Sequence, residues 1–159
     1  MEQMTLFELP FKYIIDTSSI LSQKDTELHR RTINKTLWKY IDELIKQKRI
    51  VTCSEIMEEV NDKDIKKWYV GLNGEILPID DEVQTNVKKV VTSNPQLVDF
   101  KENKSSGDAF LIATAVKYGY TVITEENKTK QKKIPFVCKN LNVHCVDIIG
   151  LCEQEGWSF

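Results

Sequence analysis

Short apolar runs alternate with longer amphipathic segments along this chain of 159 residues, and this alternation restricts its fold more than any other feature. Runs such as residues 12–15 (KYII) and 121–124 (TVIT) are rich in the branched and aromatic residues of buried strands. Strands that alternate with helices favour a parallel sheet with helices on its faces. We therefore predict an α/β protein, a three-layer α/β/α sandwich around a mostly parallel sheet, in a single domain over residues 1–159.

The predicted strands and helices follow one another along almost the whole chain. The strand candidates are residues 12–15, 50–53, 75–79, 121–124 and 143–147. Apolar residues at helical spacing predict helices over about 28–48, 54–60, 61–70, 80–91, 108–118 and 148–154. Ser54 is the expected N-cap of the second helix, and Gly119 ends the fifth. Residues 94–104 are expected to be irregular because Pro95 breaks regular structure, and residues 1–10 form an N-terminal extension.

Composition and charge narrow the class of protein. No apolar run approaches the roughly 18 residues of a membrane span, and the N-terminus lacks the basic and apolar regions of a secretory signal. We therefore expect a cytoplasmic protein without membrane contact. The four cysteines form no C-x-x-C pair, so we expect no structural zinc site and mostly buried, reduced thiols. They are Cys53, Cys138, Cys145 and Cys152.

The net charge is −2, whereas nucleic-acid-binding domains are usually basic. The basic residues are nevertheless grouped. The first group is Lys128, Lys130, Lys132 and Lys133; the second is His29, Arg30, Arg31, Lys35 and Lys39; the third is Lys63, Lys66 and Lys67. Each group alone is best interpreted as solvated surface. Together, the groups are compatible with a basic rim around an acidic pocket.

Acidic residues fall where strands of the predicted sheet end. Asp16 follows the first strand, and Glu125 and Glu126 follow residues 121–124. Ligands of such sheets bind beyond the carboxyl ends of the strands. Asp108 heads the face of a predicted helix formed by Leu111, Ile112, Ala115 and Val116. A carboxylate on an apolar face is costly unless it is paired or bound to metal, although an acid that simply favours the helix dipole is the alternative.

Glu59 is selected from three glutamates on one predicted helix. On a helical wheel it lies nearest the apolar stripe of Ile56 and Val60, while Glu55 and Glu58 point away. The wheel alone fits a solvated glutamate better. Four carboxylates at one edge repel one another without a cation, by about 4 kcal/mol for two charges ~4 Å apart at an effective dielectric near 20. Oxygen ligands suit magnesium, manganese or calcium rather than zinc.

These segments resemble the motifs of the PIN-domain family, which includes VapC-type toxins and several RNA-processing nucleases. Residues 14–21 (IIDTSSIL) are similar to its opening strand and Asp-Thr pair. Residues 51–60 (VTCSEIMEEV) resemble its second acidic motif, with the acid at Glu59. Residues 105–127 (SSGDAFLIATAVKYGYTVITEEN) match best, with an Asp that opens a helix, then a strand and an acid. Trp68, residues 134–138 and residues 156–159 further resemble an uncharacterised bacterial PIN-like branch.

The resemblance implies a magnesium- or manganese-dependent endoribonuclease with catalytic metal ligands at Asp16, Glu59, Asp108 and Glu126. Most family members have Asp at the fourth position, so Glu125 stays open as an alternative to Glu126. Polar neighbours are expected to support the site, although turn, strand-end and solvated-loop roles explain them equally well: Thr17, Ser18, Thr124 and Lys128. The implied partners are an RNA substrate, an antitoxin protein if the chain is a toxin, and a second copy in a homodimer. The alternative is a catalytically inactive PIN-like module that binds RNA or protein.

Overall fold

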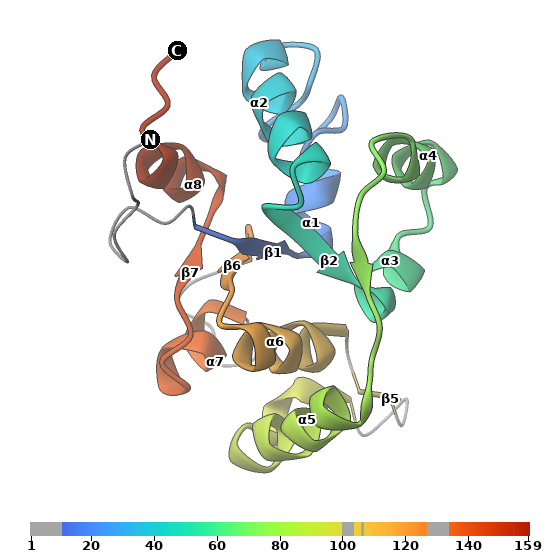
Figure 1. Cartoon of the computed structure of the whole chain (residues 1–159), viewed down its shortest axis with the longest axis vertical. Helices are drawn as coiled ribbons and strands as arrows, with labels where there is room; N and C mark the ends of the chain where they lie inside the picture. Colours follow the sequence, from blue (N-terminus) through green and yellow to red (C-terminus); the bar gives the residue numbers. More distant parts are fainter. Residues whose placement is uncertain (1–10, 100–103, 106, 127–133) are drawn as a thin grey trace, which may run out of the picture.

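The structure, a computed structural model, describes residues 11–99, 104–105, 107–126 and 134–159. Five parallel strands form its central sheet in the order β3-β2-β1-β6-β7 (Figure 1). Their bounds are β1 Tyr13–Ile15, β2 Ile50–Cys53, β3 Ile76–Leu77, β6 Thr121–Ile123 and β7 Cys145–Val146. A separate antiparallel pair joins β4 (Val98–Asp99) to β5 (Lys104–Ser105). The central strand β1 therefore has a parallel neighbour on each side.

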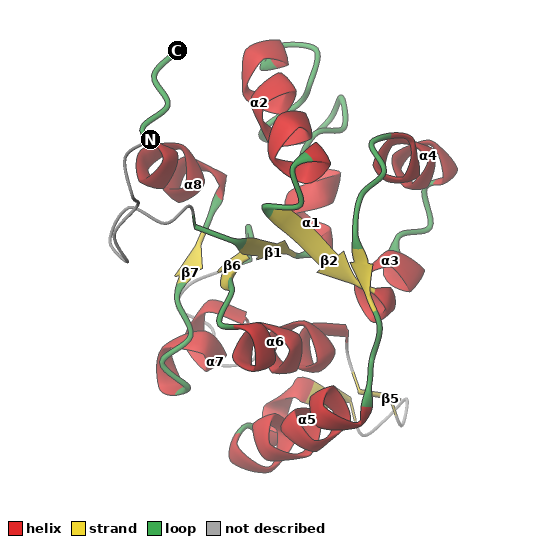
Figure 2. Ribbon diagram, viewed as in Figure 1, coloured by secondary structure: helices red, strands yellow, loops and turns green. Residues whose placement is uncertain are grey.

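Helices cover both faces of this sheet. They are α1 Thr17–Leu21, α2 Lys35–Lys46, α3 Ser54–Glu59, α4 Lys63–Gly71, α5 Asp81–Ser93, α6 Gly107–Tyr118, α7 Ile134–Asn140 and α8 Ile148–Glu155. Figure 2 shows α2 and α8 on one side of the sheet and α5, α6 and α7 on the other, with α5 outside α6. The predicted three-layer α/β/α sandwich is confirmed. Among the described residues, no helix is long and apolar enough to cross a membrane.

Burial explains why the short strands form. Every residue of β1, β2 and β6 is buried, as expected for a parallel sheet whose two faces are covered. Helix α6 is buried more broadly than the predicted face: Ala109 and Ala113 are fully buried, while Val116 is 44% exposed. The reason is that α5 packs on α6 from the side opposite the sheet. Asp108 therefore begins a helix that is enclosed on two sides, not one with a single apolar stripe.

Several local predictions were wrong. Residues 94–104, which were expected to be irregular, include the 3₁₀ helix Pro95–Leu97, the strand β4 and the start of β5. The helix expected over residues 28–48 begins only at Lys35, because residues 28–34 form turns that bury His29. Ser54 is the first residue of α3, and the N-cap is Cys53, which makes no side-chain capping bond. Helix α7 was not predicted; its second residue is Pro135, and proline is tolerated in a first helical turn. The assigned extension, residues 1–10, lies outside the described residues.

Candidate active site

Asp16 lies at the carboxyl end of the central strand and precedes α1 as its N-cap. Its side chain is buried, and the residue is 2% exposed. Its Oδ2 accepts hydrogen bonds from Ser18 Oγ at 2.7 Å and Thr124 Oγ1 at 2.9 Å. Burial raises the pKa of Asp16 above its usual value. The hydrogen bonds from the two hydroxyls offset only part of this rise. Within the described ranges, no Lys, Arg or His lies at salt-bridge distance from this carboxylate.

Glu59, the last residue of α3, reaches across to the start of α6. Its Oε1 accepts the backbone N–H of Gly107 at 2.7 Å, and its Oε2 accepts the Thr17 hydroxyl at 3.1 Å. A Cβ on Gly107 would overlap the Glu59 carboxylate, so the absence of a side chain at Gly107 allows this approach. Asp108 follows Gly107 in the first turn of α6 and is half-buried. Glu59 thus joins the segments that carry Asp16 and Asp108.

The two glutamates after β6 have different contacts. Glu125 Oε1 accepts the N–H of Ile148 at 2.7 Å, where α8 begins, and its Oε2 lies 3.3 Å from His29 Nε2. Both oxygens of Glu125 are therefore engaged in holding α8 and the turn around His29. Glu126 accepts the N–H of Ile134 at 2.9 Å, where α7 begins. Its own N–H donates to Thr124 Oγ1, which in turn donates to Asp16. The N–H of Glu125 has a matching connection, because it donates to Ser18 Oγ, which also donates to Asp16. Both glutamates therefore stay candidates for the fourth acid.

The structure thus places the candidate acids at one edge of the sheet. Ser18 and Thr124 donate to Asp16, and Thr17 donates to Glu59. Thr124 also accepts the N–H of Glu126. Among the described residues, no three His, Cys, Asp or Glu side chains lie close enough to form a group that holds a metal ion. Lys128 lies outside the described residues. The four acids thus share an edge of the sheet, and within the described ranges they form no closed ligand cluster.

The basic groups of the sequence have several different roles. In the second group, His29 contacts Glu125, and Arg31 forms two hydrogen bonds with Asp42. The Arg31 guanidinium also lies over Trp38 at 5.3 Å and Trp68 at 5.5 Å from the ring centroids. The side chains of His29 and Arg31 therefore stabilise the fold. Lys35 and Lys39, also in the second group, are exposed. The first group lies outside the described residues.

Cys138 was not predicted as part of this region. All four cysteines are free, and two of them, Cys53 and Cys138, are buried. A hydrogen bond with Cys145, burial and the carboxylates of Asp16 and Asp108 all raise the pKa of the Cys138 thiol. A neutral thiol therefore lies near the acids. Gly107 was likewise missed as a contact of Glu59; the glycine directly before Asp108 at a helix start was its only signal in the sequence.

No curated protein matches this sequence. The model of one family, described as a domain of unknown function (DUF4411), matches residues 13–159. The chain belongs to this family. The match covers every strand and helix that the structure describes, so the DUF4411 unit and the described fold coincide.

Solved structures show which fold this DUF4411 chain has. FitAB bound to an IR36 DNA fragment is similar at TM-score 0.55 and 18% identity, over 86% of this chain and 94% of the other. VapBC2 of Rickettsia felis on promoter DNA gives TM-score 0.54 and 15% identity, over 86% and 98%. DNA-bound VapBC of Salmonella typhimurium gives 0.52 and 15%, over 87% and 98%. The DUF4411 chain therefore has a VapC-like PIN fold, which confirms the resemblance predicted from the sequence.

Proposed function

We propose that this DUF4411 protein is a divalent-metal-dependent endoribonuclease that hydrolyses RNA phosphodiester bonds. The observation that carries the proposal is Asp16, a buried carboxylate at the end of the central strand with hydroxyl partners. A buried carboxylate is costly unless a positive charge compensates it. No side-chain cation does so among the described residues. A bound metal ion supplies that charge in our proposal.

The chemistry of the donor set fits magnesium or manganese. Asp16 and Asp108 are proposed to hold the principal ion, and Glu59 and Glu126 to complete the acid ring directly or through water. All four offer oxygen, which these ions prefer. Hydroxyl groups already orient Asp16, and the Gly107 N–H orients Glu59. Such partners of ligating groups maintain the geometry of a metal site.

The chain's own residues define how a phosphodiester would be handled. A divalent ion bound here supplies an activated water and stabilises negative charge on the phosphate and the leaving oxygen. Ser18 and Thr124 hold the Asp16 carboxylate in one orientation. Helix α6 directs its N-terminus toward the Glu59 carboxylate, and the positive end of its dipole favours negative charge at that point. Products with a 5′-phosphate and a 3′-hydroxyl are expected by likeness to the PIN family.

Asp16→Asn tests this proposal with little change in shape. We expect RNA cleavage in manganese to fall about a thousandfold, because a catalytic metal supplies several kcal/mol to the transition state. The measurement is the sequencing of RNA ends after incubation with each purified protein. Asp25→Asn is the matched control, since Asp25 is an exposed aspartate that the proposal does not place in the site. Equal cleavage by wild type and Asp16→Asn would assign the activity to another centre or a contaminant.

Absence of cleavage by the wild-type protein would instead support the alternative, a PIN-like module that binds without cutting. By likeness to VapC-type toxins, we also propose that the chain is a toxin neutralised by a small protein partner. Expression of the wild-type chain should then arrest growth, and co-expression of a neighbouring small gene should restore it. Growth arrest that persists in Asp16→Asn would contradict toxicity through this site.

A further inference from the structure

We propose that a second surface of this protein binds single-stranded RNA through aromatic rings and lysines. We call it the aromatic–lysine face, and it consists of Lys35, Lys39, Tyr40, Trp157 and Phe159. The inference rests on the proposed function for its substrate class, because it assigns where an RNA strand lies outside the acid edge.

The rings of this face form one exposed group. Tyr40 lies 5.3 Å from Trp157 and 5.4 Å from Phe159, and the two C-terminal rings are 6.4 Å apart, all measured between ring centroids. The ring planes meet at 51° to 76°, so no ring is stacked on another. Tyr40 is 41% exposed and Phe159 is 67% exposed. Adjacent exposed apolar groups of this kind mark interaction surfaces, and ring faces that are not stacked internally offer stacking sites for bases.

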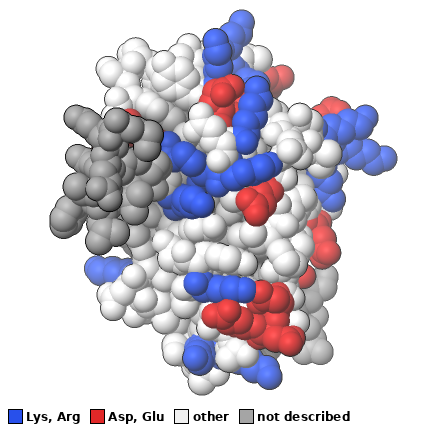
Figure 3. Space-filling model, viewed as in Figure 1, with Lys and Arg blue, Asp and Glu red and all other residues white. Residues whose placement is uncertain are grey.

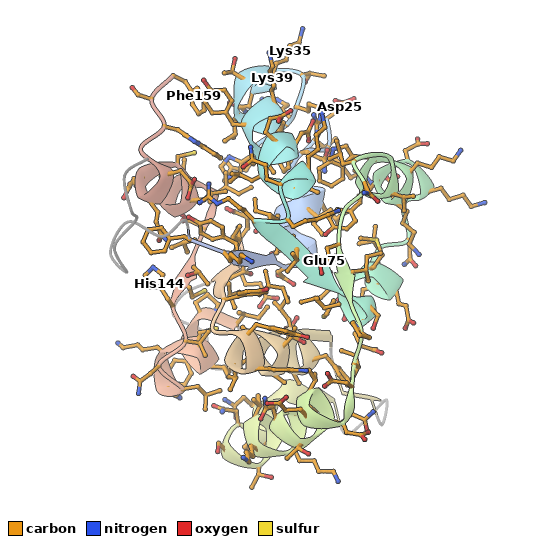
Figure 4. All side chains as sticks on the ribbon, in the orientation of Figure 1. Asp25, Lys35, Lys39, Glu75, His144 and Phe159 are labelled. Atoms are coloured by element: carbon orange, nitrogen blue, oxygen red, sulfur yellow. The ribbon has the colours of Figure 1, made fainter. Side chains whose placement is uncertain are left out.

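The charge beside these rings is positive. Lys35 and Lys39 are exposed and one helical turn apart on α2, and neither forms an ion pair with another described residue. The two acids of α2 have partners, because Asp42 pairs with Arg31 and Glu43 pairs with Lys46. Figure 3 shows blue side chains over α2 in the upper part of the molecule, with some red side chains between them. Figure 4 shows Lys35, Lys39 and Phe159 at that same end.

This combination favours a nucleic-acid strand over a protein partner. Single-strand binding sites combine cations that follow the phosphates with aromatic rings on which bases stack. One RNA strand therefore matches both halves of the face, whereas an apolar protein surface would match the rings and leave two ammonium groups unpaired.

The face also connects to the acid edge. Lys35 lies in the first turn of α2, one turn before Trp38. The Trp38 indole donates to the carbonyl of His29, whose ring contacts Glu125, one of the two candidates for the fourth acid. A chain of contacts through Trp38 and His29 therefore links α2 to the acid edge.

Binding without cleavage tests the inference. The probe is a labelled oligouridylate of about 12 nucleotides, a length within the site sizes of single-strand binding folds. Its affinity for the full chain is measured by fluorescence anisotropy in EDTA, so that no metal-dependent cutting occurs. Tyr40→Ala should weaken binding about tenfold, and Tyr40→Phe should retain wild-type affinity, because stacking needs only the ring.

The lysines have a separate signature in the salt dependence. Each phosphate contact contributes about 0.7 to the slope of log K against log salt for single strands. Lys35→Ala with Lys39→Ala should therefore reduce the slope by about 1.4. Lys88→Ala with Lys89→Ala is the control, since these two exposed lysines lie on α5, on the other side of the sheet from α2, and it should leave the slope unchanged.

Several outcomes would overturn the inference. The first is that the wild-type protein does not bind the oligonucleotide at low salt. The second is that the face variants and the control variants have equal affinities and slopes. The third is that oligothymidylate binds more tightly than oligouridylate. A change in self-association on sedimentation without a change in RNA affinity would also overturn it and assign the face to a second copy. Binding that depends on the face in a protein that never cuts RNA would support the inference while the proposed catalysis fails.

Discussion

The two ends of the central sheet each bury a carboxylate, but they treat it differently. At the amino end, the Glu155 side chain is only 9% exposed and accepts hydrogen bonds from Arg49 Nη2 and Tyr13 Oη, both at 2.7 Å. At the carboxyl end, the Asp16 carboxylate accepts its side-chain hydrogen bonds from the neutral hydroxyls of Ser18 and Thr124. One buried charge has a cation from the chain itself, and the other has none among the described residues.

From this difference we propose that the amino end is structural and that the carboxyl end is functional. A buried charge that is paired and hydrogen-bonded within the chain needs no further partner. The Glu155 contacts hold α8 against the start of β1 and β2. A buried charge without such a pair lowers stability until something else compensates it. Folded proteins tolerate such costs mainly where function needs them. The comparison therefore predicts that a cation from solution acts at Asp16 and has no effect at Glu155.

The largest expected effect is stabilisation by manganese. An ion that binds only the folded state at about one hundred times its Kd contributes about 2.7 kcal/mol. For a chain of this size the melting temperature should rise by about 5 to 10 °C. Wild type and Glu155→Gln should show this shift, and Asp16→Asn should lose most of it. The measurement is a melting curve of each protein with and without manganese. If manganese raises the melting temperature of Asp16→Asn as much as that of wild type, the ion binds elsewhere and the two ends do not differ in this way.

The next effect is the loss of the ion pair at the amino end. Glu155→Gln removes the counter-charge of Arg49, whose side chain is 19% exposed. Because Arg49 retains some contact with water, we expect a loss of about 2 kcal/mol in the free energy of unfolding, below the 3–5 kcal/mol of fully buried pairs. Urea denaturation measures it. Glu153→Gln, at an exposed position of the same helix, is the control. Cleavage per folded molecule should be unchanged, and a catalytic defect would refute the structural role of Glu155.

A third prediction separates geometry from stability at the carboxyl end. Gly107→Ala places a methyl group where the Glu59 carboxylate now lies, so the flexible Glu59 side chain must move away. We expect about a tenfold loss of cleavage, the lower range for disturbed partners of a metal ligand. Stability should hold or rise by up to about 1 kcal/mol, because alanine favours a helix more than glycine does. Gly71→Ala in α4 is the control, since its Cβ would meet no atom within 4 Å. Normal cleavage by Gly107→Ala would remove Glu59 from the site.

The sheet was predictable because its strands are short, apolar and buried on both faces. The strand predicted over residues 50–53 coincides with β2, and β1 and β6 lie within the strands predicted over residues 12–15 and 121–124. Helix α7 was missed because seven residues with an early proline give too few turns for a periodic pattern. The turns around residues 28–34 were read as helix because Ile33 continues the apolar spacing, yet it is 66% exposed. Tertiary contacts of His29 and Arg31 override that local pattern.

The site was predictable only in part. Position after a strand identified Asp16, since every parallel strand ends at the same edge. Glu125 and Glu126 accept from the N-termini of different helices, α8 and α7, and spacing along the chain carries no such information. The same applies to Gly107, whose role depends on a side chain 48 positions earlier in the sequence. Contacts between distant segments are set by packing, which local patterns do not specify.

The smallest expected effect concerns the charge of Asp16 in metal-free buffer. Burial raises the pKa of Asp16 in the folded state above its value of about 3.9 in an unfolded chain. Below that value both states are protonated and the carboxyl costs little. As the pH rises toward the folded pKa, the unfolded state loses its proton first, and wild-type stability falls. Asparagine has no such titration, so the advantage of Asp16→Asn should grow from about pH 4 upward.

At neutral pH we therefore expect Asp16→Asn to melt a few degrees above wild type without metal. Thermal melts of both proteins across the pH range measure the difference, and Asp25→Asn, at an exposed position, should show none. Manganese should reverse the order, because it stabilises only the ionised carboxylate. If Asp16→Asn is instead less stable than wild type at neutral pH, the Asp16 charge is already compensated by the chain. The carboxyl end would then be as complete as the amino end, and the buried carboxylate would no longer point to a metal.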